Sequence, residues 1–124
     1  MKWLISLACA LLAVPALAQE SNWWTYNGEM LGNYAKACKA GTTDFVIAKD
    51  AVTETGMGNQ KTAISFVDRQ SGGTTVTFTT LYFDLADGRK LEVEHVSGGK
   101  GGEKITATVQ NKAGKPTASY IKCR

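Results

Sequence analysis

One histidine and two glutamates near it in the sequence are the first candidates for acid–base chemistry in this chain. His95 is the one histidine in the sequence, and Glu92 and Glu94 precede it closely. A histidine assisted by a carboxylate is a common general base in hydrolases. The segment alternates as a β-strand does, however, and this alternation places Glu92 and Glu94 on the face opposite His95. We therefore interpret His95 as a residue that packs at a strand end, and no catalytic residue is assigned.

Metal binding receives little support from the sequence. The three cysteines Cys9, Cys38 and Cys123 include no C-x-x-C pair, and a single histidine does not complete a zinc-ligand pattern. Neither a metal ion nor another cofactor is expected.

Aromatic and basic side chains indicate binding more than catalysis. Trp23, Trp24 and Tyr26 lie in a polar segment before the first predicted element. Tryptophan is enriched at the centres of protein–protein interfaces, although one of two adjacent tryptophans could pack against the core instead. Arg89 and Lys100 lie near predicted turns. We expect these five residues to form the binding site, and we expect the aromatic segment to contribute most.

The overall composition is that of one folded globular domain. The chain has 124 residues, 44% of them hydrophobic, and a formal net charge of +3. These values exclude a low-complexity or charge-expanded disordered chain. The charge is too small to favour nucleic acid as a partner.

Residues 1–18 have the pattern of a secretory signal peptide. A lysine precedes an apolar run from Trp3 to Val14, and Ala16–Ala18 provides the small residues of a cleavage site. A membrane-spanning helix needs about 20 apolar residues, so this shorter run predicts no membrane anchor. A lipoprotein signal at Cys9 is a weaker alternative, because the apolar core before it is very short. We expect residues 19–124 to form the mature protein, periplasmic or secreted.

Removal of the leader leaves Cys38 and Cys123, which can pair in one way. In an oxidising compartment an even cysteine count indicates a disulfide. The bond would close a loop of about 85 residues, a constraint worth roughly 4–5 kcal/mol in the chain-entropy view.

The elements that would hold these residues in place begin with a predicted helix over residues 28–40. Its apolar positions follow the i, i+3, i+4, i+7 spacing and are Leu31, Tyr34, Ala35 and Cys38. Gly41 suits the position just past a helix end.

After Gly41 the chain becomes rich in threonine and valine, which favours strands. Residues 44–53 are ambiguous; we prefer a strand, and a short helix is the alternative. The alternating segments that follow are 61–68, 74–85, 89–96, 103–110 and 117–123. We expect a bulge near Thr79–Thr80, where the apolar phase switches, and a hairpin at Asp87–Gly88.

These elements predict an α+β fold in a single domain over residues 19–124. One N-terminal helix would pack on a meandering antiparallel sheet of about five strands, pinned by the disulfide.

The favoured function is that of an exported binding module, an inhibitor or immunity-type protein that neutralises an enzyme in the cell envelope. It would bind a protein partner there, and its identity and the oligomeric state stay open. Small exported α+β domains often inhibit or neutralise an enzyme, and the expected function follows by analogy with them. The alternative is a small secreted hydrolase or ribonuclease-like enzyme that uses His95; it resembles secreted ribonucleases of the barnase kind in layout alone. A structural or secretion-accessory subunit is a third interpretation.

Overall fold

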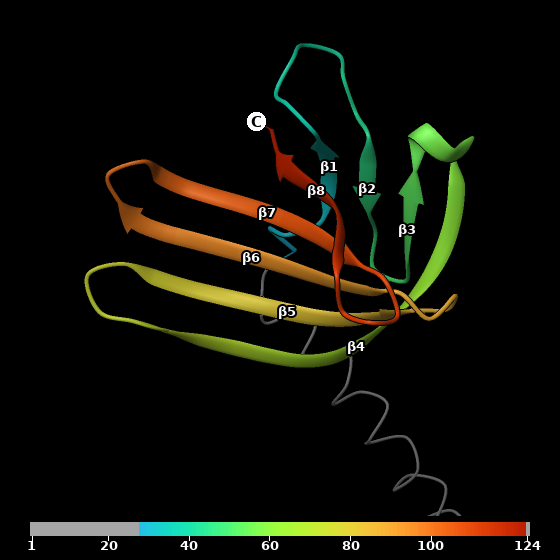
Figure 1. The fold of residues 1–124 in the computed structure, drawn as a ribbon. Helices are drawn as coiled ribbons and strands as arrows, with labels where there is room; N and C mark the ends of the chain where they lie inside the picture. Colours follow the sequence, from blue (N-terminus) through green and yellow to red (C-terminus); the bar gives the residue numbers. More distant parts are fainter. Residues whose placement is uncertain (1–27, 124) are drawn as a thin grey trace, which may run out of the picture.

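The computed structural model describes residues 28–123 and shows an all-β protein (Figure 1). Eight antiparallel strands follow one another in chain order and close into a barrel. The strands are β1 (Gly32–Ala35), β2 (Phe45–Ile47), β3 (Ala51–Glu54), β4 (Gln60–Gly73), β5 (Thr77–Leu85), β6 (Lys90–Gly99), β7 (Gly102–Gln110) and β8 (Pro116–Lys122). The only helical element in this part of the chain is the 3-10 turn η1 (Thr55–Met57), so the predicted α+β fold is wrong. Within residues 28–123, no helix has the length and apolar composition needed to cross a membrane.

The segment predicted as a helix over residues 28–40 contains a turn and the strand β1. Gly32 has a φ of +120°, which no α-helix accommodates. Strand β1 pairs with β2 on one side and with β8 on the other. Without β1, β2 and β8 would both be unpaired edges, so closing the barrel gains backbone hydrogen bonds that a short isolated helix cannot match. Barrel closure therefore prevails over the local helical spacing.

The ambiguous segment 44–53 forms two strands. Strands β2 and β3 pair as a hairpin, and the Ala48 N–H donates to the Ala51 carbonyl at 2.9 Å. The preference for strand over helix is confirmed, but the chain reverses direction inside the segment.

The later strand predictions are confirmed in position by β4 to β8, and β4 runs on to Gly73. The Asp87–Gly88 hairpin is confirmed too: Gly88 has a φ of +95°, and the Leu85 N–H donates to the Arg89 carbonyl at 2.9 Å. The bulge expected near Thr79–Thr80 lies instead in β4, between Phe66 and Asp68. The register of β5 with β6 is continuous.

Apolar side chains fill the interior of the barrel. The cluster consists of Met30, Tyr34, Phe45, Ile47, Val52, Leu81, Phe83, Leu85, Leu91, Val93, Ile105, Ala107, Val109 and Tyr120. The Phe45 ring stacks on Tyr120 with centroids 4.6 Å apart and meets Tyr34 edge to face. This core lies where all eight strands surround it.

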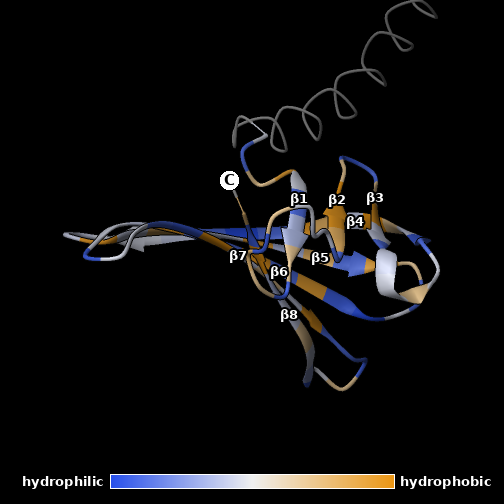
Figure 2. Ribbon diagram, turned by 90° about the horizontal axis from the view of Figure 1, so that it is seen from above, coloured by the Kyte–Doolittle hydropathy of each residue, from blue (hydrophilic) through white to orange (hydrophobic). Residues whose placement is uncertain are grey.

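Strands β4 to β7 continue beyond the barrel as a twisted four-stranded sheet, which we call the arm (residues 68–80 and 94–105) (Figures 1 and 2). Strand β3 pairs with β4 only as far as Ala63, and β8 pairs with β7 only from Thr106 onward. Among the described residues, both edges of the arm therefore lack a neighbouring strand.

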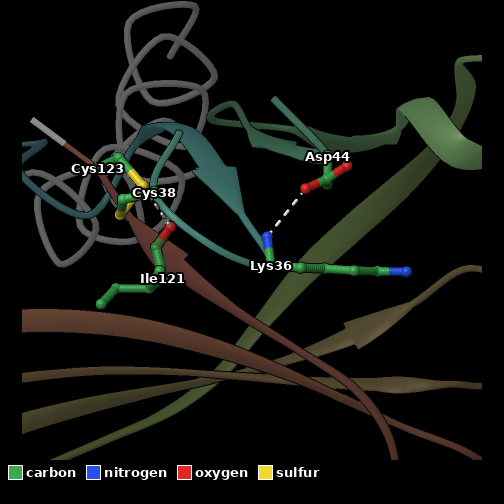
Figure 3. The surroundings of a disulfide bond; sticks show 5 residues. All are labelled: Lys36, Cys38, Asp44, Ile121 and Cys123. Atoms are coloured by element: carbon green, nitrogen blue, oxygen red, sulfur yellow. Dashed lines mark hydrogen bonds between the residues drawn. A yellow bond between two sulfur atoms is a disulfide. The ribbon is translucent and has the colours of Figure 1, made fainter. Parts of the chain in front are cut away.

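The disulfide is present as predicted, between Cys38 and Cys123, with Cα atoms 5.5 Å apart (Figure 3). Cys38 follows β1 in an irregular segment, not the buried stripe of a helix. Cys123 follows β8, so the bond lies beside the β1–β8 pairing, which has two register pairs. The disulfide thus reinforces the seam at which the barrel closes.

Candidate functional site

Three side chains from distant parts of the sequence meet at the boundary between barrel and arm. His95 Nδ1 lies 2.9 Å from Glu29 Oε1, and His95 Nε2 lies 3.1 Å from Glu103 Oε2. We call Glu29, His95 and Glu103 the His95 cluster. It joins the turn before β1 to strands β6 and β7.

The strand pattern explains where His95 and Glu103 lie. His95 shares the inner face of β6 with the buried residues Leu91 and Val93, and it is the next position along that face. Its register partner on β7 is Ile105, and Glu103 is two residues from Ile105 on the same face. The register shift between Val96 and Gly99 bends the strand pair opposite Glu103. His95 therefore begins the polar part of the inner face where the apolar core ends.

Glu29 is positioned by a tight turn. The Leu31 N–H donates to the Gly28 carbonyl at 3.0 Å, and the Tyr34 hydroxyl donates to the Met30 carbonyl at 2.7 Å. Met30 is only 2% exposed and anchors the turn in the core. The Lys122 ammonium donates to the Glu29 carbonyl. These contacts fix the backbone and leave the Glu29 carboxylate against His95.

The His95 cluster combines a mostly buried imidazole with two accessible carboxylates. The His95 side chain is 14% exposed, whereas both glutamate side chains are exposed. The adjoining cavity of about 120 Å³ is lined by Glu29, Glu103, Ile105 and Lys122. Imidazole and carboxylate are the usual groups of acid–base sites and ligands for divalent transition ions. Ligand pockets for drug-sized molecules measure about 300–1,000 Å³, so this cavity suits an ion better than an organic substrate.

A groove on the outer face of strands β4 to β7 is the second candidate site. An open groove of about 360 Å³ surrounds Tyr82, and we call it the Tyr82 groove. Its lining side chains and backbone come from Val67, Asp68, Gln70, Tyr82, Phe83, Asp84, Lys90, Leu91, Glu92 and Gln110.

Negatively charged side chains surround the Tyr82 hydroxyl. Partial burial, together with the negative charges of Glu92, Asp68 and Glu94, raises the pKa of the Tyr82 hydroxyl. That hydroxyl donates to Gln70 Oε1 at 3.1 Å. The groove therefore offers a fixed aromatic ring in a negative field.

The binding residues predicted from sequence are not gathered into one site. Trp23, Trp24 and Tyr26 lie outside the described residues. Arg89 immediately precedes β6 and Lys100 immediately follows it, so the two lie at opposite ends of this strand.

Arg89 is engaged in ion pairs within the barrel. Its Nη2 atom lies 2.6 Å from Glu54 Oε1 and 2.8 Å from Asp87 Oδ2. The hydrogen bonds to Glu54 and then Asp87 raise the pKa of Arg89, and the Arg89 side chain lowers the pKa of Asp87. Glu54 is only 6% exposed, so Arg89 neutralises a buried charge.

The sequence does not predict the partners of His95. Glu29 lies within residues 28–40, the segment predicted as a helix, and in the structure it belongs to a turn. Glu103 could have been found, because it shares the inward parity of Ile105, Ala107 and Val109 just as His95 shares that of Leu91 and Val93. For Tyr82, the sequence indicates only a position in an alternating strand, and nothing in it indicates a binding residue.

Comparison with known proteins returns no match: no family model, no curated protein and no solved structure is similar to this chain at a significant level.

Proposed function

We propose that this protein is an exported binding module that holds a positively charged surface of a protein partner in the Tyr82 groove. The observation that supports this proposal is the group of carboxylates around Tyr82. An inhibitor or immunity-type role in the cell envelope is the function class that such a module fits.

The charge of the groove is opposite to that of the whole chain. The formal net charge is +3, yet Asp68, Asp84 and Glu92 line the groove and Glu94 adds to its field. The one lysine of the lining, Lys90, lies 3.2 Å from Asp84 and so pairs within the groove. A local field of one sign steers and orients a partner of the opposite sign.

The side chains of the groove suit arginine or lysine from a partner. A guanidinium or ammonium group can lie over the ring of Tyr82 while it pairs with Glu92 or Asp68. Val67 is 55% exposed beside them and offers apolar contact. An aromatic residue surrounded by charged and apolar neighbours is typical of an interface hot spot.

The groove is built on strands, which favours a preformed site. Tyr82 lies between Asp68 on β4 and Glu92 on β6, each directly opposite it in the ladder. Side chains on paired strands lose less conformational freedom on binding than side chains on loops. The envelope location is supported by the signal-peptide pattern of residues 1–18, and the Cys38–Cys123 bond is consistent with an oxidising compartment.

The test uses the partner recovered from envelope extract by cross-linking at Val67, which lines the groove. Tyr82→Ala is expected to weaken affinity for that partner by about 30-fold, the effect of removing a hot-spot side chain. Glu92→Lys should slow association and reduce its dependence on salt. Glu103→Gln, which removes an acid from the opposite face of the sheet, is the matched control and should bind normally.

The proposal is wrong if Tyr82→Ala and Glu92→Lys both bind the partner as the parent protein does. If Trp23→Ala or Trp24→Ala alone abolishes binding, the aromatic segment predicted from sequence carries the interface instead.

A hydrolase centred on His95 is the second candidate, and the observation that favours it is the glutamate on each side of the imidazole. The small volume of the adjoining cavity argues against it. Replacement of His95 by alanine should abolish any hydrolytic activity of the purified protein, and unchanged activity would exclude this candidate.

A further inference from the structure

We propose that the His95 cluster is a binding site for a divalent first-row transition metal ion, with Glu29, His95 and Glu103 as its ligands. This proposal concerns the inner face of the sheet and is independent of the Tyr82 groove. It also differs from the expectation drawn from the sequence, in which a single histidine predicted no metal site.

The three donor atoms lie close together, and a side-chain movement would let them share one ion. One ligand atom from each of Glu29, His95 and Glu103 lies within 4.8 Å of the others. Bonds from zinc to nitrogen or carboxylate oxygen measure about 2.0–2.2 Å, so donors of one ion lie roughly 3–4 Å apart. Glu103 already faces Nε2, whereas Glu29 faces Nδ1. Both glutamate side chains are exposed, so Glu29 has room to rotate from Nδ1 toward an ion bound at Nε2.

His95 Nε2 provides a second, independent observation. This buried atom has no hydrogen-bond partner. Glu103 Oε2 lies only 3.1 Å from it, so the carboxylate is near the nitrogen but off the direction in which an N–H would donate. A buried polar atom without a partner is costly. An ion on the nitrogen lone pair would satisfy Nε2 and draw in Glu103 at the same time.

The ligand set selects among metals. One imidazole nitrogen and two carboxylates suit zinc and neighbouring transition ions, whereas calcium and magnesium prefer oxygen ligands throughout. Three protein ligands leave at least one position for water.

Lys122 is the nearby cation that opposes this site. It lines the same cavity as Glu29 and Glu103, and its ammonium donates to the Glu29 carbonyl. Its positive charge offsets part of the carboxylate charge. Lys122→Met should therefore strengthen metal binding by several-fold.

The test is a calorimetric titration of zinc chloride into the protein purified from the periplasm without a histidine tag. The wild-type protein should bind one zinc ion. His95→Gln and Glu103→Gln should each weaken zinc binding at least about tenfold, because each removes a donor atom. Glu94→Gln is the matched control, since Glu94 is adjacent to His95 in sequence but lies on the other face of β6; it should bind as the wild type does.

Thermal unfolding of the same proteins separates binding from folding. Zinc should raise the Tm of the wild type and of Glu94→Gln, because a ligand that binds the folded state stabilises it. At the same zinc concentration it should raise the Tm of His95→Gln by much less. If His95→Gln does not fold, the NMR signals of the wild-type imidazole decide: the chain has one histidine, and its ring signals must shift with zinc. The proposal is overturned if zinc does not bind, if His95→Gln binds it equally well, or if the ring signals do not respond.

Discussion

The two ends of strands β4 to β7 have opposite characters. At the barrel end of β5, Leu81, Phe83 and Leu85 are buried in the core; toward the tip of the arm, Phe78 on the same strand is 39% exposed. Strand β6 changes in the same way, from buried Leu91 and Val93 to His95 and the glycine-rich turn. The barrel end therefore holds the stabilising apolar contacts, and both candidate sites lie next to that core, where the strands pass into the arm.

This difference follows from which strands surround each end. The short strands β1, β2, β3 and β8 enclose only the barrel end, so only there can an inward side chain be covered from all sides. In the arm the sheet has no second layer among the described residues, and its inner face is correspondingly polar. Substitutions at the two ends should therefore lower the free energy of unfolding by very different amounts.

The largest effect is expected in the barrel core. Phe45→Ala should lower the free energy of unfolding by about 3–5 kcal/mol, because it leaves a cavity beside the Tyr34 and Tyr120 rings. Phe78→Ala in the arm is the matched change and should cost no more than about 0.5 kcal/mol. Urea unfolding measures both, and equal losses would contradict the division between barrel and arm.

The next effect is expected at the buried ion pair of the barrel. Arg89→Met should cost about 3 kcal/mol, because it leaves the Glu54 carboxylate buried without a partner. Lys90→Met, which removes the exposed pair with Asp84, should cost less than about 1 kcal/mol. The double variant Glu54→Gln with Arg89→Met should regain part of the lost stability. If Arg89→Met is as stable as Lys90→Met, the barrel does not depend on this pair.

Loss of the disulfide should reduce the free energy of unfolding by a slightly smaller amount. Replacement of both Cys38 and Cys123 by serine should lower the free energy of unfolding by about 2–4 kcal/mol, since the bond restricts the unfolded chain over 85 residues. A reducing agent should reduce the stability of the wild type to that of the double variant and leave the double variant unaffected. Thiols that react with a labelling reagent in the native protein would contradict the bond.

The smallest effect concerns the outer face next to the arm. Glu92→Gln should lower the pKa of Tyr82 toward its ordinary value, because the lost negative charge no longer disfavours the phenolate. Ultraviolet absorbance titration measures this, and the spectrum of Tyr82→Phe serves to subtract the other tyrosines. An unchanged titration would mean that Glu92 contributes little to the field of the groove.

The sequence allowed most of the arm and half of the barrel to be predicted. Residues 61–123 alternate clearly, and their strands and the Asp87–Gly88 turn lie where the pattern indicates. The N-terminal third could not be predicted, because Tyr34 and Ala35 fit a helical stripe while their strand is stabilised by pairing with β8, nearly ninety positions later. Barrel closure depends on pairing between strands that are far apart in the sequence. The local spacing of apolar residues does not predict such pairing.

The same limit applies to the site. The inward parity of His95 was evident from β6, and that of Glu103 could have been seen from β7. Glu29 could not be placed beside them, since its position depends on the turn that leads into the closing strand. The expected disulfide was correct because cysteine pairing depends on counting and not on local conformation.

The Cys38–Cys123 disulfide also determines how the molecule should respond to mechanical force. When residues 28 and 123 are pulled apart, the force acts along the chain from residue 28 through β1 to Cys38. It then passes through the disulfide to Cys123. Strands β2 to β8 lie inside the loop that the bond closes, so they carry almost none of that load. Only the short strand β1 can peel away and lengthen, and reduction of the bond would expose the whole barrel to the pull. In the oxidised state, the extension under tension should therefore be limited to residues 28–38, while strands β2 to β8 stay paired.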